Sequence, residues 1–253
     1  MKNQSFALCL TLILFLAGLC LLAGCVGEKT DLVTPTIEPP RDAAVSFSGA
    51  GDQSTTMPLS AGVHLLTLEV EKPAGSEPTK TMVSIMTEKD GISLFGEFTD
   101  EVLTDALMDG KYRWSQAFML EEDANATVEV SQLAHWDLIF GFPEMINGIP
   151  PQTFSGIGNR ATPFFMIPAG DYTCKITAEE MTVISVGLMK YDGTMLMDGD
   201  SIAPLAFHEL RDADYELSVG NYSTTVPVTI KNGDNYLFNI ICDGSWEVTF
   251  TPV

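Results

Sequence analysis

The sequence predicts an all-β protein of two tandem antiparallel β-sandwich domains, jelly-roll-like, that follow a leader and a tether. Three observations predict this fold: short apolar runs at the spacing of sandwich strands, Gly-containing turns between them, and a segment pattern that occurs twice. Hydrophobic residues make up 45% of the chain and charged residues 19%. The chain can therefore bury a core, and its composition is not that of a disordered protein.

The leader occupies residues 1–24 and has the pattern of an export signal. Lys2 precedes a charge-free, leucine-rich run from Phe6 to Ala23. The run ends in Leu-Ala-Gly-Cys, which resembles the lipobox of prokaryotic lipoproteins and implies lipidation of Cys25. We therefore expect a cell-membrane protein, lipid-anchored and facing the extracellular or periplasmic side. The alternative is an uncleaved transmembrane anchor, because the apolar run is near the lower length limit for a span.

The predicted tether, residues 25–43, begins at the lipidated cysteine. It is rich in Thr, Pro and charged residues and has no apolar period. This composition is typical of a semi-extended segment that holds a folded part away from the membrane.

The folded part contains an internal repeat. The pattern Phe-Ser-Gly-x-Gly stands at residues 47–51 and again at 154–158, and residues 110–140 align without a gap with 220–250. Identical residues of that alignment are Gly110/Gly220, Tyr112/Tyr222, Asn125/Asn235, Trp136/Trp246 and Phe140/Phe250. We expect two domains, at 44–141 and 153–253, joined by a linker at 142–152 whose prolines suit a connection.

Strands are expected where apolar and polar residues alternate. In the first domain they are residues 44–48, 63–71, 81–88, 92–98, 114–120, 126–132 and 136–140. In the second they are residues 171–178, 181–190, 194–197, 215–218, 224–230, 235–242 and 246–251. Asp-Gly pairs at 90–91 and 192–193 mark hairpin turns. Residues 101–108 could form a short helix, because their apolar side chains fall on one helical stripe.

The two Phe-x-Gly-x-Gly patterns, a strand after an Ala-Gly pair and a closing Gly-x-Trp segment resemble small β-sandwich modules of secreted and lipid-anchored prokaryotic proteins. They are broadly similar to pre-peptidase C-terminal domains. The resemblance covers nearly the whole chain after the tether, and it implies a non-catalytic extracellular accessory or binding module. The first copy departs from the pattern at residues 134–136, where Ala-His-Trp stands in place of Gly-Ser-Trp.

The composition also limits the chemistry. The 13 Lys and Arg against 34 Asp and Glu give a formal net charge of −21, which disfavours nucleic acid as a partner. No motif of a serine hydrolase, zinc protease or P-loop enzyme occurs. His64, His135 and His208 lie at no metal-ligand spacing, and His64 shares an apolar face with Leu66 and Leu68. We therefore expect no enzyme, no cofactor and no metal, and a structural role for His64.

Two acidic groups remain to be explained, Asp192, Asp198 and Asp200, and then Asp212 and Asp214. Calcium takes oxygen ligands from such loops. The spacing matches no EF-hand, however, so solvated turns are the favoured interpretation and a calcium site is the alternative.

Cys174 and Cys242 are the two cysteines beyond the lipobox, and the alternation of their strands directs both inward. A disulfide between them is the favoured interpretation for an exported protein. Two buried free thiols are the alternative.

Three exposed sites are also predicted. Asn125 and Asn221 begin Asn-x-Ser/Thr triplets and are possible glycosylation sites. Trp114 has Thr224 opposite it in the repeat, so we expect it to be exposed and available for a ligand.

The predicted function is that of a lipid-anchored surface protein whose two sandwiches serve adhesion, envelope organisation or protein binding. Its partners would be the membrane, through the lipid, and an extracellular protein or glycan. The alternative is a carbohydrate- or solute-binding lipoprotein. Exposed aromatic residues around Trp114 would favour this alternative.

Overall fold

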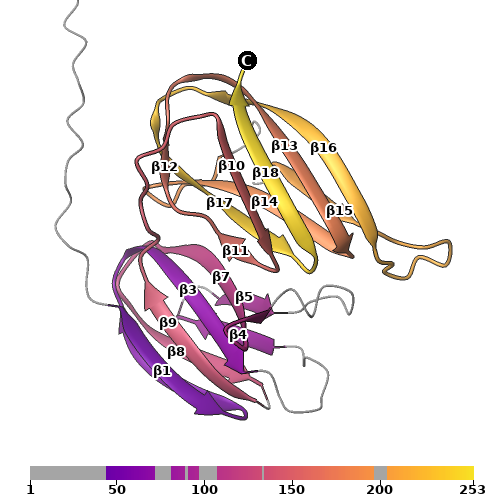
Figure 1. The fold of residues 1–253 in the computed structure, drawn as a ribbon. Coiled ribbons are helices and arrows are strands. Elements are labelled where there is room, and N and C mark those ends of the chain that lie inside the picture. The colour runs from indigo at the N-terminus through magenta and orange to yellow at the C-terminus, as the bar shows by residue number, and fades with distance from the viewer. Residues whose placement is uncertain (1–43, 72–80, 89–90, 97–106, 133, 197–203) are drawn as a thin grey trace, which may run out of the picture. The chain divides into compact units, whose positions relative to one another are not determined.

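Every regular element that the structure describes is a β-strand, and all paired strands are antiparallel (Figure 1). In this computed structural model the described residues are 44–71, 81–88, 91–96, 107–132, 134–196 and 204–253. Residues 42–253 form one compact unit. Within the described residues, no helix has the length and apolarity needed to cross a membrane.

The first sandwich is built from two sheets that enclose one apolar core. One sheet has the order β1-β9-β3-β7-β6, made by Val45–Ala50, His135–Gly141, Gly62–Glu71, Lys111–Leu120 and Leu107–Met108. The other has the order β2-β8-β4-β5, made by Gln53–Leu59, Ala124–Ser131, Thr81–Met86 and Gly91–Gly96. Leu68, Val83, Val128 and Leu138 from both sheets are fully buried between them.

The second sandwich repeats this strand order. One sheet has the order β10-β18-β13-β16, made by Gln152–Ile157, Ser245–Pro252, Gly170–Met181 and Gly220–Ile230. The other has the order β11-β17-β14-β15, with β12 also paired to β17, made by Arg160–Ala161, Asp234–Cys242, Val183–Lys190, Ala206–Glu209 and Phe165–Ile167. Ile176, Val186, Phe238 and Val248 lie in its core.

The repeated glycine and tryptophan positions form the same contact in both sandwiches. The indole N–H of Trp136 donates to the carbonyl of Gly51 at 3.0 Å, and that of Trp246 donates to Gly158 at 2.9 Å. Gly51 and Gly158 have φ values of +73° and +70°, a conformation that glycine adopts without a steric penalty. The Phe-x-Gly-x-Gly pattern is therefore repeated because its last glycine turns a carbonyl toward the buried tryptophan.

Several predicted elements differ from the structure. The pattern missed β2, whose residues are mostly exposed, β10, in which no residue is fully buried, and the short strands β11, β12 and β15. Residues 215–218 do not form a regular strand, and Leu217 takes part only in an isolated bridge with Arg211. Met195 likewise forms an isolated bridge. Of the helix considered at 101–108, residues 101–106 lie outside the described residues, and residues 107–108 form strand β6.

A third apolar cluster joins the two sandwiches. Val63 and Ala117 from the first pack with Phe164, Met189 and Leu237 from the second. The side-chain amide of Asn239 accepts from the Ala117 N–H at 3.1 Å and donates to the Ala117 carbonyl at 2.9 Å. The Ser115 N–H donates to the Asn159 carbonyl at 3.0 Å. The second sandwich therefore satisfies backbone groups along the outer edge of β7.

The predicted linker is also bound in place. Phe142 stacks on Phe164 with ring centroids 5.6 Å apart. The Ile146 N–H donates to the Phe164 carbonyl at 2.9 Å, and the Phe164 N–H donates to the Glu144 carbonyl at 2.7 Å. These contacts fix residues 142–146 against the second sandwich.

Candidate functional site

Trp114 is not an exposed ligand contact, which corrects the prediction. Its side chain is 1% exposed in the core of the first sandwich. Strand β7 buries Tyr112 and Trp114 on one face while Lys111 and Arg113 point to the other. The comparison with Thr224 misled because the equivalent strand β16 is less covered, so Thr224 is itself half-buried.

The predicted disulfide is also absent, because Cys174 and Cys242 are both buried free thiols. Cys174 lies in β13 opposite Phe250, whereas Cys242 lies at the end of β17 and accepts from the Gly244 N–H. Cys242 lies near Glu179, because Gly244, two residues after Cys242, approaches Glu179 so closely that an added Cβ would stand 2.3 Å from the Glu179 carbonyl oxygen. Glu179 is five residues beyond Cys174 along β13, about 16 Å at about 3.3 Å per residue. Alternation directed both thiols inward, but toward different ends of the core.

The other predicted sites have ordinary surroundings. His64 stacks on Phe118, and its Nε2 lies 2.7 Å from the Ser60 carbonyl oxygen, as expected of a structural histidine. Asn125 and Asn221 are both exposed, and the Asn221 side chain accepts from the Glu180 N–H. Cys25 lies outside the described residues.

In the acidic loops of the second sandwich, Asp192 and Asp212 form ion pairs or hydrogen bonds within their own turns. Asp192 pairs with Lys190 at 2.9 Å. Burial works to raise the pKa of Asp192, but hydrogen bonds from Lys190 and Thr194 lower it overall. Asp212 accepts from the N–H groups of Asp214 and Glu216. Asp198 and Asp200 lie outside the described residues.

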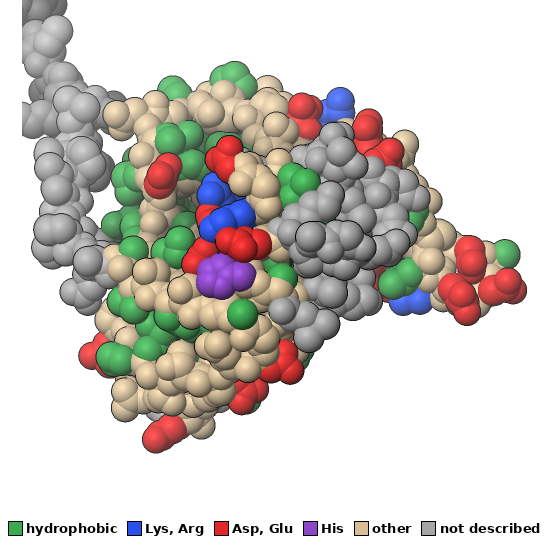
Figure 2. Space-filling view, turned by 60° about the horizontal axis from the view of Figure 1, so that its bottom comes forward, with side chains coloured by type: hydrophobic (Ala, Val, Ile, Leu, Met, Phe, Trp, Pro, Cys, Tyr) green, Lys and Arg blue, Asp and Glu red, His purple; other side chains and the backbone are tan. Residues whose placement is uncertain are grey.

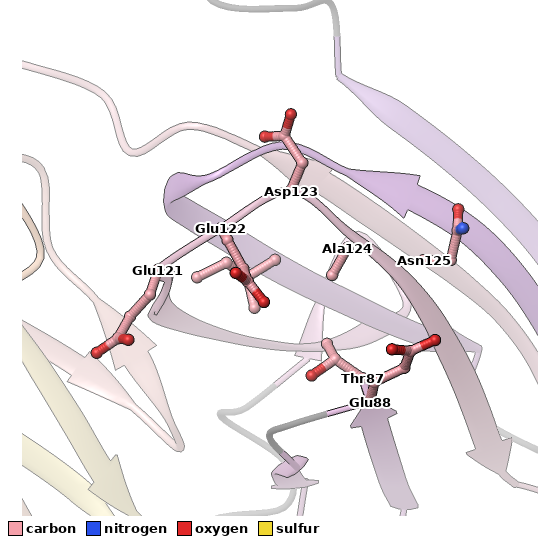
Figure 3. Close-up of a pocket in the computed structure, with 8 residues that line it drawn as sticks. Thr87, Glu88, Glu121, Glu122, Asp123, Ala124 and Asn125 are labelled. Carbon is pink, nitrogen blue, oxygen red and sulfur yellow. The ribbon is translucent and has the colours of Figure 1, made fainter.

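A hollow at one end of the first sandwich is lined by carboxylates (Figure 3). It holds about 190 Å³ beside the β7–β8 turn. Figure 3 shows Glu121 and Asp123 pointing away from each other, and Asp123 accepts from the Ala61 N–H at 2.7 Å. No group of three or more His, Cys, Asp or Glu side chains in the described part of the chain is arranged to hold a metal ion. The acidic residues of the β7–β8 turn form much of the wall of this hollow.

A patch of mixed charge lies on the outer face of the first sandwich, and Figure 2 shows basic, acidic and histidine side chains gathered on one face. Lys111 pairs with Asp137 at 2.7 Å and with Glu69 at 3.5 Å, and Arg113 also pairs with Glu69. The hydrogen bond to Asp137 is the main reason that the pKa of Lys111 is raised. Burial, and then the neighbouring Arg113, lower the pKa of Arg160 to about 10.

This patch has the features of an ion-pair ladder across strands. Glu69 stands opposite both Arg113 and Asp137 in the register of the sheet. The resolved pKa shifts leave Lys111 and Arg160 protonated at neutral pH, so neither serves as a general base there. The ion pairs of this patch are therefore structural contacts between strands, and not a site of proton transfer.

Four exposed apolar side chains gather elsewhere, on and beside a projecting connection between β15 and β16 (Figure 1). We call residues 210–218 the arm. Tyr215 is 80% exposed at its tip, and Leu217 is 54% exposed. Phe207, just before the arm, and Val219, just after it, are 59% and 46% exposed. Among the residues whose side chains the structure describes, Phe207 and Tyr215 are the exposed Phe, Tyr and Trp side chains.

The arm is held by its own hydrogen bonds. The Ser218 N–H donates to the Leu210 carbonyl at 3.0 Å, and the Asp212 N–H donates to the Glu216 carbonyl at 2.8 Å. Tyr215 has a φ of +63°, which is uncommon for a residue other than glycine and occurs often at functional positions. Arg211 donates to the Tyr215 carbonyl at 2.9 Å. A folded hairpin therefore presents these apolar side chains to solvent.

The sequence predicts a strand at residues 215–218, whereas the structure has the arm there. Tyr215, Leu217 and Val219 alternate with polar residues, which is the pattern of a half-buried strand. Alternation gives the period of an extended chain, but it does not say whether a second sheet covers the apolar face.

Neither a protein-family model nor a curated protein matches this sequence. The tandem domain CBM22-1-CBM22-2 of Paenibacillus barcinonensis Xyn10C matches with a TM-score of 0.25 and 9% identity, over 82% of this chain and 93% of that chain. The plant receptor-like kinase FER matches with a TM-score of 0.25 and 8% identity, over 81% and 82%. Infectious bursal disease virus Gx strain matches with 0.18 and 12%, over 84% and 73%. TM-scores this low carry no argument about function.

Proposed function

We propose that this protein is a non-catalytic, lipid-anchored surface protein that binds another protein through the arm and its neighbour Phe207. The exposure of Phe207, Tyr215 and Leu217 within eleven residues is the observation that carries the proposal. Tyrosine and other aromatic residues dominate the energy of protein interfaces, because they bury a large area at a small cost in side-chain entropy.

The charges around the arm indicate the kind of partner. Glu209, Asp212, Asp214 and Glu216 are opposed by Arg211 alone between residues 207 and 219. An apolar centre with an acidic rim suits a partner surface that has an apolar pocket surrounded by Lys or Arg. Such a rim would speed association and make the rate fall with added salt.

A pull-down from envelope extract, with a fragment that begins at residue 44, tests the proposal. The fragment keeps nearly all of the compact unit. Tyr215→Ala combined with Leu217→Ala should weaken retention of a specific protein by about 30-fold, which corresponds to the roughly 2 kcal/mol of an interface hot spot. Met82→Ala combined with Met86→Ala, which removes two exposed side chains from β4, should leave retention unchanged. Equal losses in both variants would contradict the proposal.

A glycan array with the same fragment tests the alternative of carbohydrate binding. The buried position of Trp114 removes the aromatic residue on which that alternative rested. Binding of a glycan that is lost on Phe207→Ala or Tyr215→Ala would replace the protein-binding proposal with the carbohydrate one.

The lipid anchor has its own test. Cys25→Ser should move the full-length protein from the membrane fraction to the soluble fraction, because the sulfur is the site of acyl attachment. Retention of the variant in the membrane would favour the uncleaved anchor.

A further inference from the structure

The two sandwiches differ at one edge, although their strand order repeats. In the first, strand β6 pairs with the start of β7, with Leu107 opposite Tyr112. Farther along this edge of β7, the second sandwich bonds the backbone of Ser115 and Ala117. In the second sandwich β16 is the equivalent of β7, and within the described residues it pairs with β13 alone. An edge that is covered in one copy is thus open in the other.

The sequence explains why the second copy lacks its β6. Asp109 and Gly110 form the tight turn between β6 and β7, with φ values of +53° and +79°. Two-residue hairpin turns of this kind need positive φ at both positions, which favours Asp-Gly. The aligned residues are Val219 and Gly220, and a β-branched valine strongly disfavours positive φ. Leu217, the counterpart of Leu107, therefore stays on the arm.

The missing strand leaves the core beside β16 less covered. Tyr112 and Trp114 of β7 are 2% and 1% exposed. Their counterparts Tyr222 and Thr224 in β16 are both half-buried. Leu107 packs against the first core from strand β6. Beside β16, His208 stacks on Tyr222 with ring centroids 4.5 Å apart and Leu210 packs near Gly220, but among the described residues no strand pairs with this edge.

The backbone of β16 also presents hydrogen-bonding groups outward. Pro227 has no N–H, and it stands opposite Thr173 in the ladder with β13, so its nitrogen faces away from β13. Because the direction of backbone groups alternates along a strand, Ser223 and Thr225 direct their N–H and carbonyl groups to the same open side. Both residues are exposed, and β16 carries no charged side chain.

We infer that the open edge of β16 accepts an extended segment of a partner protein as an added antiparallel strand, in the place that β6 occupies in the first sandwich. The inference deepens the proposed function, since the arm leads directly into this edge. The added segment would place a leucine-sized side chain beside Tyr222, whose ring stacks on His208, as Leu107 stands opposite Tyr112 in the first sandwich, and would pair with Ser223 and Thr225. Pro227 ends the pairing because it offers no donor. Strand addition of this kind gives affinity through the backbone and specificity through alternate side chains.

A synthetic peptide tests this edge without knowledge of the natural partner. The probe has the sequence of residues 103–109, with two lysines added at its amino end to offset the acidic arm. It should bind the fragment from residue 44 and slow the exchange of the Ser223 and Thr225 amide hydrogens, since hydrogen-bonded amides exchange slowly. Absence of binding at millimolar peptide would overturn the inference.

Variants of the edge sharpen the test. Thr225→Pro removes the outward N–H and keeps the ladder with β13, so it should weaken peptide binding by at least about tenfold. Thr225→Val keeps the N–H and is the matched control, with binding expected to stay unchanged. Val219→Asp restores the Asp-Gly turn, so residues 217–218 should fold onto the edge and compete with the peptide. Equal peptide affinity in Thr225→Pro and Thr225→Val would contradict strand addition.

The outcome separates this inference from the proposed function. Tyr215→Ala should reduce capture of a partner protein and leave peptide binding intact. If the peptide fails to bind while capture still depends on Tyr215, the arm remains a binding surface and the open edge is not used.

Discussion

Trp136 and Trp246 make the same hydrogen bond in the two sandwiches. Each is buried, and each donates its indole N–H to a carbonyl that only a glycine in a left-handed conformation turns toward it. Gly156 adds a further constraint, because a Cβ at that position would stand 2.6 Å from the ring of Trp246. The glycine pattern and the tryptophan are therefore one structural unit divided between the two ends of each domain sequence.

Replacement of the second tryptophan tests this unit. Trp246→Phe keeps an aromatic ring but removes the donor, which leaves the Gly158 carbonyl without its partner. We expect the free energy of unfolding to fall by about 1–3 kcal/mol in denaturant titration, the usual cost of a lost buried hydrogen bond. Tyr215→Phe, at an exposed position, is the control and should change stability little. An unchanged midpoint for Trp246→Phe would show that packing alone holds the ring.

The buried cysteines give a second prediction at the scale of residues. Burial raises the pKa of Cys174 and of Cys242 to about 12, and only thiolates react quickly with alkylating agents. In the fragment from residue 44, iodoacetamide at pH 8 should label neither thiol in the native state and both in denaturant, as read by mass spectrometry. Failure to label in denaturant without reductant would reveal a disulfide.

The same thiols bear on stability at high pH. The pKa of both thiols is higher in the folded protein than the value of about 8.5 expected in the unfolded chain. Their contribution to the free energy of unfolding is therefore fully present below about pH 8.5. It should be lost progressively between about pH 9 and pH 12, because the unfolded chain releases these protons first.

At the scale of elements, β7 and β16 occupy the same position in the repeat but have different surroundings. The Ala117 N–H and carbonyl bond the Asn239 side chain, whereas the aligned residue Pro227 has no N–H to offer. Val63, Ala117, Met189 and Leu237 form the apolar contact between the sandwiches. Thr229 and Asp171 on the second sandwich bond each other at 2.7 Å on an exposed face. Strand β7 therefore lies at the interface between the sandwiches, whereas the equivalent strand β16 has an open edge among the described residues.

Asn239→Ala tests the contact that Asn239 makes between sandwiches. The change removes two hydrogen bonds to the backbone of β7, so the free energy of unfolding should fall by about 1–3 kcal/mol in denaturant titration. Asn232→Ala, which alters an exposed side chain in the preceding turn, serves as the control. Equal stability of the two variants would show that water replaces the amide without cost.

At the scale of the whole molecule, the apolar cluster and the backbone contacts couple the two sandwiches. The third core takes Val63 from one and Leu237 from the other, each 3% exposed or less. Phe142 and Ile146 in the connection are held against Phe164. Neither sandwich can unfold without exposing apolar surface of its neighbour.

Calorimetry of the fragment from residue 44 checks this coupling. A single transition whose van't Hoff and calorimetric enthalpies agree is expected for one cooperative unit. Leu237→Asp should separate the sandwiches and give two transitions, because it buries a charge in the shared cluster. Two resolved transitions in the unaltered protein would mean that the sandwiches fold independently.

Sequence periodicity predicted the long strands well, because burial of one face imposes alternation within a single segment. Predicted residues 63–71 and 235–242 correspond to β3 and β17. Short strands such as β11 and β15 were missed, since two to four residues carry too little periodic signal. The repeat in the sequence reappears in the strand order of both sandwiches.

The candidate site was much less predictable. Whether Trp114 or Tyr215 is exposed depends on what covers each strand, and that covering comes from segments distant in sequence. The sequence by itself determined the β class, the alternation of the long strands and the repetition of the glycine and tryptophan positions, because these are local or repeated constraints. Only the tertiary structure decided that Cys174 and Cys242 lie apart, that Trp114 is core, and that the arm and the β16 edge are open. Those outcomes depend on which sheets face each other and which edges find a partner, and such contacts between distant segments leave no period in the chain.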